Sequence, residues 1–119
     1  MPARLRPAEP AEVEAALAAL EAGEAGRPER KLLVKHFLAL LEQRAPGRSV
    51  EVRVPPYAAV QCVDGVRHTR GTPPAVVETD ADTWIAVATG RLAWRDAVGR
   101  GSVTASGERT DLTTYLPLA

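Results

Sequence analysis

The residue types best suited to chemistry in this sequence are one cysteine and two histidines. Cys62 is the only cysteine, and His36 and His68 are the only histidines. A zinc site needs three or four nitrogen, sulfur or oxygen ligands at workable spacing, so we expect no metal centre. Cys62 alternates with Val60 toward the side of a predicted strand that should be buried, where a free cysteine packs as a small hydrophobe. The alternative is a reactive thiolate near His68, which requires exposure and a basic neighbour.

The only local cluster of positive charge is VRHTRG, residues 66–71. The simpler interpretation is a solvated hairpin whose arginines pair with nearby carboxylates. The alternative is an anion clamp for a carboxylate or phosphate head group, because the planar fork of arginine suits both. Arg70 is the better candidate for that role, since Gly71 and Pro73 would hold its loop in a defined shape. The carboxylates offer no convincing acid–base pair.

The two tryptophans, Trp84 and Trp94, lie on consecutive predicted helices. Their simplest role is in the core, and the alternative is that they line an apolar cavity and orient a ligand. His36 lies at the edge of the apolar stripe of its predicted helix, which favours a packed structural histidine over a ligand.

The composition predicts one soluble cytoplasmic domain over residues 1–119. Fifteen acidic side chains balance fifteen basic ones, so no overall field attracts nucleic acid or an anionic membrane. The N-terminus lacks the apolar run of a signal peptide, and no apolar stretch approaches the ~18 residues that cross a bilayer. We expect a flexible lead-in over residues 1–8, two helices within 9–45, and a sheet with two short helices within 49–107.

Hydrophobic periodicity places the elements that must position these residues. A period near 3.6 predicts helices from about Pro10 to Gly23 and from Pro28 to Arg44, the second much more apolar than the first. A third helix should begin after the N-cap Asp80 and stop at Gly90. A short fourth helix follows, and a helical turn is expected after Asp111. A period of two predicts strands over residues 50–54, 58–63, 66–69, 75–79 and 102–106.

These elements predict an α+β fold: an about five-stranded, mainly antiparallel sheet with helices packed on one face. The C-terminal part carries a recognisable order of motifs. They are an acid-capped helix from Asp80 to Trp84, then Ala88-Thr89-Gly90-Arg91-Leu92, a short helix ending near Gly101, and a strand from Ser102 to Gly107. In this order the run resembles the sterol carrier protein family.

The likeness extends over roughly Val50 to Leu118, and the residues before Asp80 are similar to a bacterial branch of that family. A related domain is found at the C-terminus of maleylpyruvate isomerase-like proteins, whose metal chemistry belongs to a separate helical domain. The resemblance implies a five-stranded sheet flanked by helices, an apolar tunnel for fatty acyl chains or sterols, and no catalysis. Members of the family with well-defined tunnels usually carry a longer C-terminal segment, which closes the cavity, than the one that ends here at Ala119. We therefore expect a tunnel that is open, shallow, filled by side chains or closed by a partner subunit.

The resulting prediction is a non-catalytic protein, without a cofactor, that binds or carries a lipid or other apolar small molecule between sheet and helices. No nucleic acid and no integral membrane association are expected. The alternative is a protein interaction or homodimerisation module without a small-molecule ligand. The residues predicted to contact the ligand, with Arg70 holding a polar head group, are Phe37, Leu41, Val52, Val60, Cys62, Arg70, Val77 and Trp84.

Overall fold

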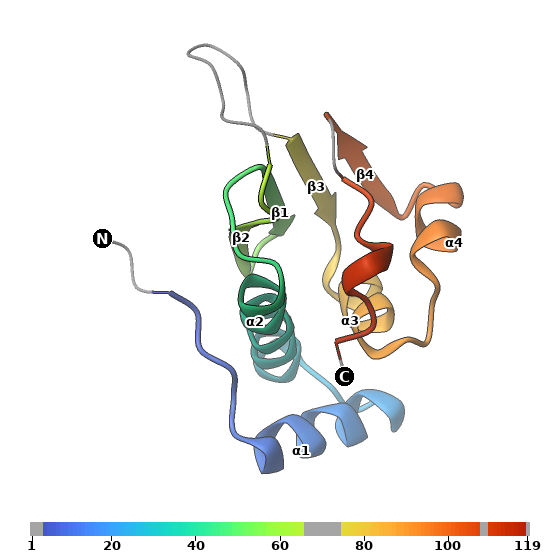
Figure 1. Cartoon of the computed structure of the whole chain (residues 1–119). Helices are drawn as coiled ribbons and strands as arrows, with labels where there is room; N and C mark the ends of the chain where they lie inside the picture. The colour runs from blue at the N-terminus through green and yellow to red at the C-terminus, as the bar shows by residue number, and fades with distance from the viewer. Residues whose placement is uncertain (1–3, 66–74, 108–109, 119) are drawn as a thin grey trace.

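The computed structural model describes residues 4–65, 75–107 and 110–118, which form one sheet and its surrounding helices (Figure 1). This confirms the α+β class. The elements are, in chain order, α1 (Pro10–Glu21), α2 (Arg27–Arg44), β1 (Val50–Val54), β2 (Ala58–Cys62), β3 (Ala75–Thr79), α3 (Ala81–Thr89), α4 (Trp94–Gly99), β4 (Val103–Ser106) and a 3-10 turn, η1 (Thr113–Tyr115).

Within the described residues the sheet has four strands in the order β2-β1-β3-β4, not about five as predicted, and it is mixed rather than mainly antiparallel. β1 pairs antiparallel with β2 and parallel with β3, and β3 pairs antiparallel with β4. The prediction was wrong because β2 folds back on one side of β1, and the chain then crosses to the other side, where β3 runs in the direction of β1. The predicted strand over residues 66–69 lies outside the described residues.

The sheet has one buried and one exposed face, as the alternation of side chains predicts. The burial patterns of β1 and β3 are the same, with the first, third and fifth side chains buried and the fourth exposed. Helices cover the buried face. Within the described residues, no helix combines the length and the apolar composition needed to cross a membrane.

α2 is the central helix of the core. Its apolar stripe is too wide for a surface helix, and the structure packs it against α1, α3 and β2. Its first turn is closed by Glu29, whose carboxylate accepts a hydrogen bond of 2.6 Å from the backbone N–H of Gly26. The buried side chains of α2 are Leu33, Val34, Phe37, Leu38, Ala39 and Leu41.

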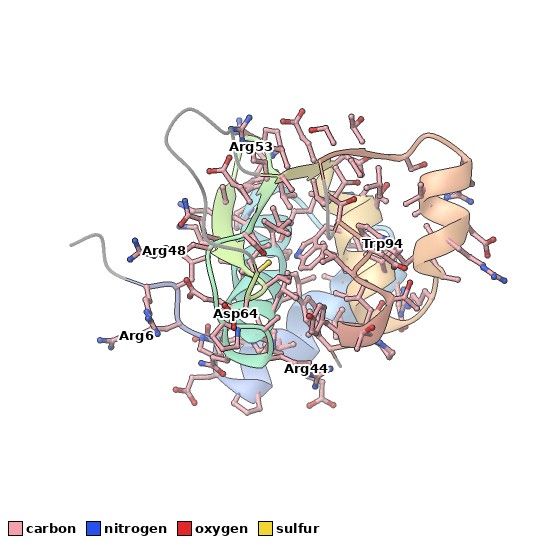
Figure 2. The ribbon with its side chains drawn as sticks, turned by 45° about the horizontal axis from the view of Figure 1, so that its top comes forward. Arg6, Arg44, Arg48, Arg53, Asp64 and Trp94 are labelled. Carbon is pink, nitrogen blue, oxygen red and sulfur yellow. The ribbon has the colours of Figure 1, made fainter. Side chains whose placement is uncertain are left out.

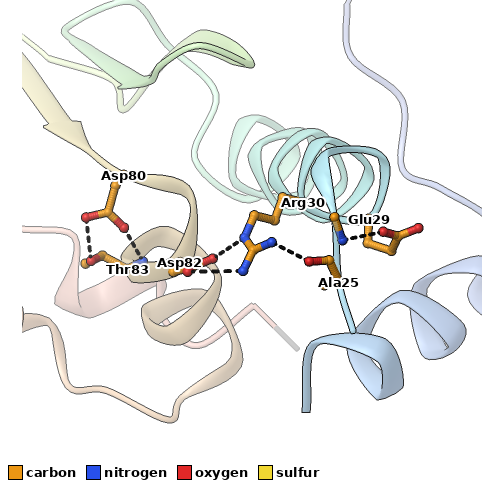
Figure 3. Close-up of polar contacts among 7 residues, drawn as sticks. Ala25, Glu29, Arg30, Asp80, Asp82 and Thr83 are labelled. Atoms are coloured by element: carbon orange, nitrogen blue, oxygen red, sulfur yellow. Dashed lines mark hydrogen bonds and ion pairs between the residues drawn. The ribbon is translucent and has the colours of Figure 1, made fainter. Parts of the chain in front are cut away.

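α3 begins and ends as the sequence predicts. Asp80 caps the helix by accepting a hydrogen bond of 2.8 Å from the backbone N–H of Thr83, and Gly90 ends it in the left-handed conformation at φ 83°. Asp82, in the first turn of α3, forms an ion pair of 2.7 Å with Arg30 of α2 (Figure 3). The first turns of α2 and α3 are therefore tied together on the core side of the sheet.

Candidate functional site

The structure gathers seven of the eight predicted ligand residues into one buried cluster. None of the seven is more than 6% exposed. Their side chains meet between the sheet and helices α2 and α3, and they pack against one another. Their contact with a ligand stays a prediction, and Arg70 lies outside the described residues. The seven are Phe37 and Leu41 on α2, Val52 on β1, Val60 and Cys62 on β2, Val77 on β3 and Trp84 on α3.

The C-terminal segment, residues 110–118, closes part of this core. Leu112 and Leu118 are buried in the same cluster. The guanidinium of Arg44, at the end of α2, donates to the backbone carbonyls of Tyr115 at 3.0 Å and Pro117 at 2.7 Å (Figure 2). The backbone N–H of Leu118 donates to the carbonyl of Ala88 at 2.7 Å. Of the states expected for the tunnel, side-chain filling best describes this part of the molecule.

A groove of about 680 Å³ lies beside the filled core, between α4, β4 and the C-terminal segment. Trp94 and Val98 of α4 and Ala105 of β4 form its apolar part, and Trp94 is labelled in Figure 2. Val98 is 41% exposed, whereas Trp94 and Ala97 of the same helix are buried. The other described residues that line the groove are Ala93, Arg95, Gly99, Thr110, Asp111 and Thr113.

The groove continues the predicted ligand-binding face of the sheet. Ala105 lies opposite Val77, Val77 opposite Val52, and Val52 opposite Val60. Directly opposed residues of neighbouring strands project from the same face, so these four side chains form one row across the sheet. Three of them are predicted ligand residues and are buried, whereas Ala105 is exposed. Ala105 was not among the site residues predicted from the sequence, because its place in this row depends on how β4 pairs with β3.

The polar side of the groove has one well-organised carboxylate. Asp111 accepts hydrogen bonds from the backbone N–H of Thr113 at 3.0 Å and from its hydroxyl at 2.5 Å. These two bonds hold the pKa of the Asp111 carboxyl below its ordinary value. Arg95 lines the same groove and is exposed. An amphipathic molecule could therefore place apolar atoms against Trp94 and Val98 and keep polar atoms at the solvated side.

Cys62 has the environment of a packed side chain. It is 0% exposed, and burial, together with the charge of Glu42, raises the pKa of its thiol to about 12. The thiol is therefore neutral at physiological pH, which is a poor state for a nucleophile. His68, the partner in the thiolate interpretation, lies outside the described residues.

His36 has a structural hydrogen bond. Its Nδ1 accepts a bond of 2.9 Å from the backbone N–H of Ala8, and its ring meets Phe37 edge-on with the centroids 4.9 Å apart. Burial lowers the pKa of the imidazole. This arrangement fits the packed histidine that the sequence favoured, and it attaches the segment before α1 to α2.

In residues 4–65, 75–107 and 110–118, no three His, Cys, Asp or Glu side chains form a group suited to holding a metal ion. Comparison with known proteins finds a match over residues 26–118 to a family described as bacterial SCP ortholog. No curated protein matches the chain. The matched range includes α2, the whole sheet, the groove and the C-terminal segment.

Proposed function

Because the chain belongs to the bacterial sterol-carrier-like family, we propose that it binds an apolar or amphipathic small molecule, without a chemical step, in the groove between α4 and β4. The observation that carries this proposal is the row of side chains from Val60 to Ala105, which leads from the buried core to an exposed groove floor. The groove volume of about 680 Å³ lies in the range of small-molecule sites.

Desolvation supplies the driving force for binding. Each Å² of apolar surface removed from water contributes about 25 cal/mol, and the apolar atoms of Trp94, Val98 and Ala105 in the groove lining offer such surface. The polar end of an amphipathic ligand stays near Arg95 and the threonines of the C-terminal segment. The predicted role of Arg70 as a head-group clamp remains part of this proposal.

The predicted core residues become the inner wall of the site. Val77 is the neighbour of Ala105 in the row, so it is the first of the predicted ligand residues that the inner end of a ligand meets. Val52 and Val60 follow only if the ligand displaces side chains that now fill the core. A short ligand would occupy the groove alone, and a longer one would extend along the row.

The absence of a chemical step is supported by the groove lining. The described lining residues include no cysteine and no histidine, and the Cys62 thiol lies in the core with a pKa near 12. Reversible binding in an exposed groove suits carriage, since the ligand exchanges without unfolding of the protein. A cytoplasmic location is part of the same proposal.

Native mass spectrometry of the purified protein tests the proposal directly. We expect a co-purifying apolar molecule, or binding of a member of a panel of fluorescent fatty acyl probes. Protein that is consistently empty and ignores the whole panel would contradict ligand binding in any part of the fold.

Two substitutions in β4 test the location. Ala105→Leu places a larger side chain on the groove floor, and we expect it to weaken probe binding roughly tenfold or more, as overpacking commonly does. Thr104→Leu is the matched control, because Thr104 pairs with Glu78 on the opposite, exposed face of the sheet. Equal effects of the two changes would show that the groove is not the site.

A further inference from the structure

Trp84 carries a buried hydrogen-bond donor without a partner. Its side chain is 0% exposed. Among the described residues, its indole Nε1 is the only buried side-chain nitrogen or oxygen that makes no hydrogen bond. Leaving such a donor unpaired costs about 1–3 kcal/mol, so native proteins rarely keep one without a reason.

Trp84 lies on α3, which packs against α4, a helix that lines the groove. It is one turn into α3, which starts directly after β3, and α3 packs against both α2 and α4. β3 and β4 carry the groove floor through the opposed pair Val77 and Ala105. Trp84, Trp94 and Val77 belong to the same buried cluster. A ligand that extends past Ala105 into this cluster would reach the indole by displacing side chains that now fill the core.

The protein and water are poor partners for this donor. The two buried hydroxyls of the described chain, on Ser49 and Thr79, donate to the backbone carbonyls of Val63 and Ser102, and neither accepts from the indole. An ordered buried water needs two to four polar partners. The side chains of the cluster that contains Trp84 are apolar, so they offer a water molecule there no hydrogen bonds.

The chemistry of the core indicates which ligand atom suits the indole N–H. The N–H only donates, so its partner must be an acceptor. No charged side chain is buried among the described residues, so a carboxylate at this depth would have no counterion. A hydroxyl would accept the bond but leave its own proton unpaired. A carbonyl oxygen accepts and carries no donor of its own.

We propose that Trp84 selects apolar ligands that carry a ketone or ester carbonyl near the inner end, with the carbonyl oxygen accepting the bond from the indole N–H. This inference rests on the proposed function and adds a ligand class and a positioning residue to it. The groove provides the apolar surface and the entrance. The indole N–H then fixes how deep the ligand lies, because the hydrogen bond forms only where the ligand carries its carbonyl oxygen.

Titration of ¹⁵N-labelled protein with three probes of equal chain length, namely a methyl ketone, an alkane and a fatty acid anion, tests the inference. The chain has two tryptophans, so two indole N–H signals are expected, and the unliganded Trp94→Phe variant identifies that of Trp84. A long-chain methyl ketone should move the Trp84 signal downfield and bind about tenfold more tightly than the alkane. The fatty acid anion should leave the Trp84 signal unchanged.

Replacement of Trp84 by benzothienylalanine, a ring of nearly the same shape with sulfur in place of the N–H, should abolish the preference for ketone over alkane. The same replacement at Trp94 is the control and should preserve it. Should the Trp84 replacement fail to fold, the wild-type titration still decides. Ketone binding without movement of the Trp84 signal would refute the selection by Trp84 and leave the proposed function intact. Binding of none of the three probes would refute the inference, and it would refute the proposed function as well if native mass spectrometry also finds the protein consistently empty.

Discussion

At the scale of single residues, His36 links stability to pH. Its Nδ1 can accept from the Ala8 N–H only while it carries no proton, and burial lowers the pKa of the ring below its ordinary value of 6.5. The unfolded chain therefore binds a proton more readily than the folded one. The stabilisation is fully present above pH 6.5 and is lost as the pH falls from there through the folded-state pKa.

The substitution His36→Asn should remove this part of the pH dependence. The side-chain oxygen of Asn lies close to the position of Nδ1, so it can keep the bond from Ala8 without titrating. We expect the free energy of unfolding, measured by urea denaturation at several pH values, to fall less below pH 6.5 in the variant than in the wild-type protein. Parallel curves would mean that His36 makes no contribution to the pH dependence.

Cys62 should react with iodoacetamide only when the protein unfolds. Burial and the charge of Glu42 keep its thiol neutral by raising the pKa to about 12, and the reacting species is the thiolate. Labelling followed by mass spectrometry should be slow in buffer and should accelerate strongly at denaturant concentrations that unfold the chain. Rapid labelling of the folded protein would instead favour the thiolate interpretation of Cys62 and His68.

At the scale of elements, local signals predicted more than long-range pairing did. Asp80 and Gly90 mark the ends of α3 through contacts within a few residues, so their roles can be derived from the sequence. The parallel pairing of β1 with β3 cannot, because it depends on how the chain crosses the sheet between them. For the same reason, the sequence predicted Val52, Val60 and Val77 on one face but not the exposed Ala105 at the end of their row.

The cap of α3 gives a stability prediction at this scale. Asp80→Ala removes the acceptor for the Thr83 N–H and should lower the free energy of unfolding by about 1 kcal/mol, whereas Asp80→Asn keeps a capping oxygen and should cost less. Asp82→Ala is the comparison, because it breaks only the solvent-exposed ion pair with Arg30 and should change stability little. Thermal and urea unfolding measure all three. An equal loss in the Asp80 and Asp82 alanine variants would contradict the capping role.

At the scale of the whole molecule, the core explains why the candidate site was only partly predictable. Valine and alanine on a sheet face can either pack tightly or leave space for a ligand, and the sequence pattern is the same in both cases. In the structure, Leu112 and Leu118 join the cluster from the C-terminal segment. The space near α4 is left as a groove between α4, β4 and the segment after β4, and the alternation of apolar residues does not show how far that segment covers it.

The oligomeric state separates ligand binding from the interaction module that the sequence left as the alternative. We expect a monomer by size-exclusion chromatography with light scattering. Within the described residues, Val98 is the only large apolar side chain that is exposed, at 41%, whereas a stable dimer interface commonly buries more than about 1,000 Å² with an apolar centre.

A stable dimer would change the interpretation of the groove if Val98 lies at its interface. Val98→Asp would then return the protein to a monomer, and Thr104→Asp, on the opposite face of β4, would not. In a monomer, Val98→Asp should instead leave the mass unchanged and weaken probe binding, because it places a charge on the apolar wall of the groove. The two measurements on one variant therefore distinguish a groove that is filled by a second copy of the chain from one that is filled by a small molecule.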